Sequence, residues 1–155
     1  MVKFVSYEIA KAGTWSKSFD LCVLSYDERF LRRKVIHTVQ GDELLVDLEQ
    51  TTSLGQGDAF VLDDGRRIEI FAAEEPLLQI QGDLVRLAWH IGNRHTPCQI
   101  DQDRLLIQND PVIGHMLEHL GAQVTQVSDV FMPEGGAYGH GRTHSHEHGK
   151  TAHDD

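Results

Sequence analysis

The spacing of apolar residues changes near Pro76, and this change most limits what the chain can fold into. Before Pro76, apolar and polar residues alternate in short runs, as they do in β-strands that bury one face. After it, two stretches repeat apolar residues every three or four positions, as amphipathic helices do. The chain therefore predicts two small units of different type, with Pro76 as a plausible boundary between them.

The first half, from Met1 to about Glu75, predicts an all-β unit. The runs FDLCVL (19–24) and ELLVDL (43–48) have the composition of half-buried strands. In AFVLDDGRRIEIFAA (59–73), the pair Asp64-Gly65 predicts a two-residue hairpin turn between two strand-forming runs.

The second half predicts the order β-α-β-β-α-β. The expected elements are a strand (77–81), a helix (84–91), a hairpin (98–108), a helix (111–120) and a strand (122–127). Asp83 and Asp110 are the expected helix N-caps, and Gly92 and Gly121 the expected helix ends. The expected apolar faces are Leu84, Leu87, Ala88 and Ile91 in the first helix, and Val112, Ile113, Met116, Leu117 and Leu120 in the second. We therefore expect an α+β chain whose second unit is ferredoxin-like, with both helices on one face of an antiparallel sheet.

After Pro133 the chain has no apolar periodicity and is rich in Gly, Ser, Thr and His. Such a composition cannot form a core, so we expect a flexible tail. The expected organisation is a β domain (1–75), a ferredoxin-like domain (76–137) and the tail (138–155). Five of the ten histidines of the chain lie in this tail: His140, His144, His146, His148 and His153.

Composition excludes several classes of partner. The net charge of −10 disfavours nucleic acid, because neutralising phosphates requires a basic surface. No apolar run approaches the roughly 20 residues of a membrane span, and the N-terminus lacks the apolar stretch of a signal peptide. Cys22 and Cys98 are far apart and belong to no C-x-x-C pattern. We expect a cytoplasmic protein with no membrane or nucleic-acid partner.

Residues 115–119 read H-x-x-E-H, a zinc signature of inverted metallopeptidases. His115 and His119 share one helical face and could bind one zinc ion, with Glu118 as general base. A peptidase also needs a third ligand and a substrate cleft, which two small domains supply poorly. Since the apolar side chains of this helix face the core, both histidines lie on its flank, where solvated side chains are the commoner case. We expect no enzyme activity and keep a zinc peptidase as the third hypothesis.

The tail histidines are the stronger indication of metal binding. His144, His146 and His148 alternate with other residues, so two or three imidazoles can surround one cation. Neutral imidazole binds Ni(II), Cu(II) and Zn(II). An expression tag would be an unbroken histidine run, whereas Ser, Glu, Thr and Gly interrupt this one. The tail therefore predicts metal binding of poor selectivity, because a flexible site imposes no geometry.

His95 is a further candidate ligand, in the loop expected after the first helix. A lone loop histidine cannot make a tight metal site. In a symmetric dimer, however, a residue near the two-fold axis is presented twice. His95 could therefore bind metal if two copies of the chain associate around this loop.

Three segments closely resemble one known family, that of urease accessory protein E, the nickel metallochaperone of urease maturation. They are WHIGNRHTP (89–97), DPVIGHMLEHLG (110–121) and FMPEGGAYGHG (131–141). The runs LRRKVIHTVQGDELLVDLEQ (31–50) and LGQGDAFVLDDGRRIEIFAAEEPLLQI (54–80) resemble the N-terminal domain of that family. The resemblance covers nearly the whole chain, and G-N-R-H followed by P-E-G-G-A-Y is specific as a combination.

The resemblance implies a nickel metallochaperone with a β domain similar to peptide-binding chaperone modules and a ferredoxin-like metal-binding domain. It implies a homodimer formed through the second domain, with His95 of both chains in a shared nickel site. The tail histidines, His140 to His153, would complete that site or hold additional metal. Ni(II) is then cargo, passed to apo-urease in a complex with the GTPase of the pathway, urease accessory protein G.

The chain departs from the family pattern before the second helix. Some members carry H-D-H there, whereas this chain has Asn109-Asp110-Pro111. His115 lies about one turn further on and could substitute for those absent histidines, but we do not count it among the expected ligands. His90 matches a histidine of some members and is at best an auxiliary ligand. The alternative function is a divalent-metal buffer or storage protein that binds Ni(II), Zn(II) or Cu(II) through its tail without a partner.

Overall fold

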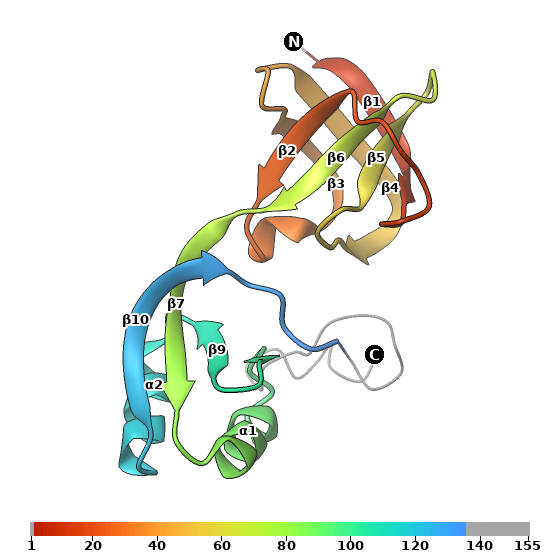
Figure 1. Cartoon of the computed structure of the whole chain (residues 1–155). Helices are drawn as coiled ribbons and strands as arrows, with labels where there is room; N and C mark the ends of the chain where they lie inside the picture. Colours follow the sequence, from red (N-terminus) through yellow and green to blue (C-terminus); the bar gives the residue numbers. More distant parts are fainter. Residues whose placement is uncertain (1, 136–155) are drawn as a thin grey trace. The chain divides into compact units, whose positions relative to one another are not determined.

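The computed structural model describes residues 2–135, and their side chains from Phe4 onward. The expected tail, 138–155, with its five histidines, lies outside the described residues. The chain divides into two compact units, Met1–Ala73 and Glu74–Asp155 (Figure 1). Strands dominate both units and helices are few, so the predicted α+β class is confirmed.

The first unit is a six-stranded mixed sheet with the order β2-β6-β5-β1-β4-β3 (Figure 1). Its elements are β1 (Val2–Ala10), β2 (Asp20–Leu24), the short 3-10 helix η1 (Asp27–Arg29), β3 (Phe30–His37), β4 (Glu43–Ser53), β5 (Ala59–Leu62) and β6 (Arg67–Ala72). The predicted turn at Asp64-Gly65 joins β5 to β6, which pair antiparallel. Gly65 has φ of +90°, a conformation that glycine adopts without steric cost. Alternate side chains of the strands form one buried apolar cluster.

The second unit is a four-stranded sheet with the order β10-β7-β9-β8, in which every neighbouring pair is antiparallel. Its elements are β7 (Glu74–Gln81), α1 (Leu84–Asn93), β8 (Gln99–Ile100), β9 (Leu105–Gln108), α2 (Pro111–His119) and β10 (Gln123–Val130). The core combines alternate strand residues with residues of both helices: Leu78, Ile80, Leu105, Ile107, Leu87, Ile91, Ile113 and Leu117. Because alternate strand residues share one face, both helices pack on the same face of the sheet.

Both predicted N-caps are confirmed. The Asp83 carboxylate accepts a hydrogen bond from the Arg86 backbone N–H, and the Asp110 carboxylate accepts two, from Val112 and Ile113. The side chains thereby satisfy N–H groups that the first helical turn leaves without partners. Pro111 occupies the first turn of α2, where its missing N–H costs no hydrogen bond.

The expected apolar face of α2 is partly wrong. Val112 and Leu120 are 75% and 45% exposed, whereas Ile113 and Leu117 are buried. Gly114 explains why the buried side of the helix differs from the expected one. It lies so close to the sheet that a Cβ there would be 2.9 Å from Leu78 Cδ1. The helix therefore contacts the sheet along the side that contains Ile113, Gly114 and Leu117, whereas Val112 and Leu120 turn outward.

The position of Pro76 also differs from expectation, because Pro76 lies inside β7 and the two units meet at Ala73 and Glu74. Pro76 opposes Ser128 of β10, while β9 pairs with β7 only from Leu77 onward. One side of β7 is therefore without a strand partner at Pro76, and the missing N–H is tolerated there.

Candidate metal site

The structure places His95 at the C-terminal end of α1, in a hydrogen-bonded helix-ending motif. The helix does not stop at Gly92 as expected but continues through Asn93, with Arg94 as C-cap. The Thr96 N–H donates to the Ile91 carbonyl at 3.3 Å, and the His95 N–H donates to the Gly92 carbonyl at 3.0 Å. This pair of bonds is the Schellman motif, in which His95 occupies the position that usually needs a left-handed backbone.

The backbone of His95 adopts this left-handed conformation, with φ of +58°. The second helix ends with the same pair of bonds, but there the position belongs to Gly121, with φ of +92°. Glycine is the usual residue because a Cβ raises the energy of this conformation. A histidine at an otherwise glycine-type position is therefore a local departure from the most stable choice, as functional sites often show.

The imidazole of His95 is exposed and is carried by a hydrogen-bonded helix end. The described turn after it, through Pro97, leads directly to β8. The hydrogen bonds of the helix end fix the backbone on the α1 side of His95. The direction of its Cα–Cβ bond is therefore defined. Such a position can present one nitrogen ligand with little freedom in the main chain.

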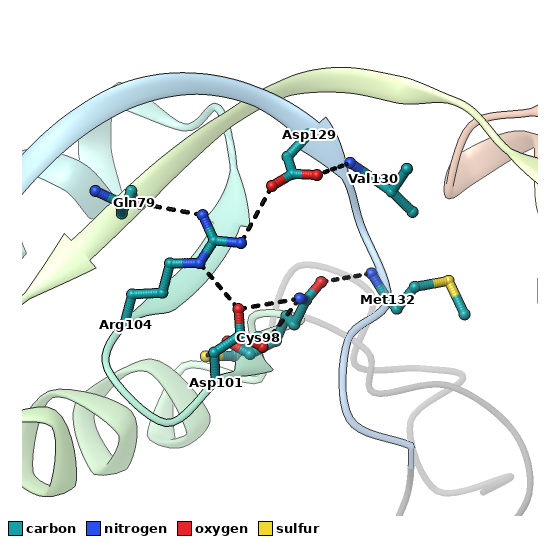
Figure 2. Close-up of polar contacts among 8 residues, drawn as sticks. Gln79, Cys98, Asp101, Arg104, Asp129, Val130 and Met132 are labelled. Atoms are coloured by element: carbon teal, nitrogen blue, oxygen red, sulfur yellow. Dashed lines mark hydrogen bonds and ion pairs between the residues drawn. The ribbon is translucent and has the colours of Figure 1, made fainter.

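A polar network lies next to this loop (Figure 2). The guanidinium of Arg104 donates to Asp101 Oδ2 at 2.9 Å, to Gln79 Oε1 at 3.1 Å and to Asp129 Oδ2 at 3.1 Å. It thus ties β7, the β8–β9 turn and the end of β10 together. Burial alone would raise the pKa of Asp101, but hydrogen bonds from Gln99 and Arg104 outweigh it and hold that pKa below its usual value.

The same network holds the chain that leaves β10. The Met132 N–H donates to Gln99 Oε1 at 2.8 Å (Figure 2). The Glu134 N–H donates to the Cys98 carbonyl at 2.9 Å. Phe131 is fully buried. The last described residues therefore run beside Cys98, three residues after His95. The sequence analysis did not identify the residues of this polar network, although Asp101 and Arg104 flank the predicted hairpin turn as an oppositely charged pair.

Cys98 is close to this site but is a poor metal ligand at neutral pH. Burial, together with the negative charges of Glu134 and Asp101, raises the pKa of its thiol to about 12. Metals bind the thiolate form, which is then scarce. Cys98 therefore serves as a packing residue.

The other candidate ligands are not gathered around His95. Within residues 2–135, no three His, Cys, Asp or Glu side chains are arranged to hold a metal ion. His90 packs edge-to-face on Trp89, with ring centres 5.1 Å apart. His115 and His119 lie together on α2. His140, His144, His146, His148 and His153 lie outside the described residues.

Comparison with known proteins identifies the family. The model of the "UreE urease accessory protein, N-terminal domain" matches residues 7–73, and that of the "UreE urease accessory protein, C-terminal domain" matches residues 75–155. A Urease accessory protein UreE from Ruegeria pomeroyi is 61% identical over 91% of this chain and 95% of its own length. One from Rhodobacter capsulatus is 54% identical over 91% of this chain and 90% of its own. The chain belongs to the UreE family.

Membership confirms the resemblance seen in the sequence. UreE proteins are accessory chaperones that act in urease maturation and are not enzymes. The prediction that this chain is not an enzyme is therefore confirmed, and the peptidase hypothesis for the H-x-x-E-H stretch is wrong. No helix within the described part of the chain is long and apolar enough to cross a membrane.

Proposed function

We propose that this protein is a nickel-binding metallochaperone that delivers Ni(II) to apo-urease during maturation of its metallocentre. Membership of the UreE family supports the role in urease maturation, since that family serves urease maturation. The exposed imidazole of His95, presented at a fixed helix end, is the observation that supports metal binding by this chain.

We propose a homodimer formed through the predicted ferredoxin-like domain, 76–137, and the strand order of the second unit supports that fold. Val85 and Trp89 are 82% and 64% exposed and lie four residues apart on one side of α1. Exposed apolar side chains of this size are typical of interaction surfaces. Because α1 ends at the His95 loop, a dimer contact along this side would bring two copies of His95 together.

Two His95 imidazoles supply two ligands, and the tail histidines His140, His144, His146, His148 and His153 would supply others. The hydrogen bond from Glu134 to Cys98 supports this, because it holds Glu134, which precedes the tail in the chain, close to the end of the His95 loop. His140 follows Glu134 by six residues, a segment that spans at most about 20 Å. A metal shell completed by tail imidazoles can be dismantled one ligand at a time by a receiving protein, which gives a route for transfer.

The proposed partners are urease accessory protein G and the apo-urease complex, in the cytoplasm. The predicted β domain, 1–75, would act as a module similar to peptide-binding chaperones. Zn(II) or Cu(II) should also bind in vitro, since imidazole does not select nickel against them. Affinity should fall as pH drops through about 6.5, because protonated imidazole cannot bind metal.

Truncation after Ala137 distinguishes this function from that of a metal buffer that acts through its tail. The metallochaperone should keep one nickel site per dimer, with altered affinity, and lose it on the further substitution His95→Ala. A buffer should lose nearly all nickel binding on truncation alone. Equilibrium dialysis of the truncated protein, with and without His95→Ala, measures the difference.

A further inference from the structure

The H-x-x-E-H stretch of α2 has no part in the proposed function, yet its side chains are arranged as a pair. The ring centres of His115 and His119 are 6.0 Å apart and the ring planes are perpendicular. His115 is 79% and Glu118 54% exposed, and His119 is also exposed. Both imidazoles are therefore open to an ion from solvent.

We propose that His115 and His119 form a separate two-imidazole site for a divalent transition-metal ion on each chain. Residues four apart lie one above the other on a helix, so both rings can reach one point in front of it. With metal–nitrogen bonds of about 2.0–2.1 Å, a shared ion would hold the two ring centres roughly 5 Å apart. Small rotations of two exposed side chains close the difference from 6.0 Å.

Glu118 favours the ligating form of His115. Its Oε1 lies 3.6 Å from His115 Nδ1. A carboxylate facing one ring nitrogen favours the tautomer that carries the proton there, and the other nitrogen then keeps its lone pair for a metal. Glu118 is thus a positioning residue, and His115 Nε2 is the expected ligand atom.

The helix end also favours a cation at this place. His119 is the last residue of α2, and Leu120 is its C-cap. The carbonyl end of a helix carries partial negative charge and attracts positive ions. Water would fill the remaining coordination positions, so binding should be reversible, and nitrogen ligands favour Ni(II), Cu(II) or Zn(II) over Mg(II) or Ca(II).

This site depends neither on His95 nor on the tail, so it can be tested without reference to the proposed function. The starting protein is the full chain with His95, His140, His144, His146, His148 and His153 replaced by alanine. Four histidines remain in it: His37, His90, His115 and His119. Titration with nickel chloride should show one Ni(II) bound per chain. His115→Ala and His119→Ala should each weaken that binding at least about tenfold, because the second ligand of a linked pair binds at high effective concentration.

His37→Ala is the matched control, since His37 Nε2 also lies 3.6 Å from a glutamate oxygen, that of Glu43. His37 is on a strand, and the residue four positions later is Gly41, so it has no paired imidazole in helical register. This substitution should leave nickel binding unchanged. Circular dichroism checks that every variant is folded.

A spectroscopic measurement locates the ion independently. Paramagnetic Ni(II) should broaden the amide resonances around His115 and His119 in the starting protein and spare them in His115→Ala. The proposal fails if the starting protein binds no nickel at millimolar concentration. It also fails if both single substitutions bind as the starting protein does, or if the broadening centres elsewhere.

Discussion

The substitution His95→Gly should leave the second unit more stable than His95→Ala does, although both remove its candidate metal ligand. His95 occupies the left-handed position of the α1 helix end at φ of +58°, where the equivalent residue of α2 is Gly121. A glycine at this position has no Cβ to clash with the backbone. The cost of a Cβ at this position is therefore visible as a gain in stability when glycine is compared with alanine there.

The expected gain follows from two opposing terms. The left-handed conformation costs a residue with a Cβ roughly 1–2 kcal/mol. Glycine loses about 0.5–1 kcal/mol more backbone freedom on folding than alanine does. The net stabilisation of His95→Gly over His95→Ala should be about 0.5–1 kcal/mol, or roughly 2–8 °C in the melting temperature of a unit of this size.

Thermal unfolding of the metal-free full chain, followed through amide resonances of α1 and α2, reads the second unit directly. Comparing His95→Gly with His95→Ala isolates the backbone, since both variants lack the imidazole. Gly121→Ala is the reverse control: a Cβ there would meet no atom within 4 Å, so only the backbone term remains. We expect it to lower stability by a similar amount. If Gly121→Ala destabilises and His95→Gly melts no higher than His95→Ala, the strain assigned to His95 is refuted.

Three further predictions follow from the described contacts. Asp83→Ala removes the N-cap of α1 and should lower the unfolding free energy by about 1 kcal/mol, measurable by urea denaturation. The lowered pKa of Asp101 means that its carboxylate stabilises the folded chain above the unfolded value of about 3.9 and loses that effect as pH falls through the folded value. The stability difference between wild type and Asp101→Asn should therefore shrink in acid; a difference that grows as pH falls would contradict the assigned contacts with Arg104. Cys98, with its pKa raised to about 12, should react with iodoacetamide at neutral pH more slowly than a free thiol, and rapid alkylation of the folded protein would count against its burial.

Local features of the fold were predictable from the sequence, because their causes lie within a few residues. The N-caps at Asp83 and Asp110 and the turn at Asp64-Gly65 depend on neighbouring backbone groups, and all are present. The end of α1 also depends on local residues, but it was predicted at the wrong residue. Gly92 resembles a stop signal, but the left-handed residue is His95, a choice that no propensity rule favours.

Contacts between distant residues were not predictable in the same way. Arg104 bonds to Asp129 across 25 residues of chain, and β1 pairs in parallel with β4. These arrangements depend on how whole strands associate, which the pattern of one strand does not specify. For the candidate site, residue type alone did not single out His95, and the resemblance to a known family did. The network that brings the segment after β10 beside Cys98 emerged from the structure.

The most direct test of the metallochaperone proposal is a calorimetric nickel titration of wild type and His95→Ala, with the oligomeric state read by light scattering. If His95 is the shared ligand, wild type is a dimer whose tightest site holds about one Ni(II) per two chains, and His95→Ala loses that site. If His95→Ala binds nickel as wild type does, His95 is not the ligand, and the metal is held elsewhere in the chain.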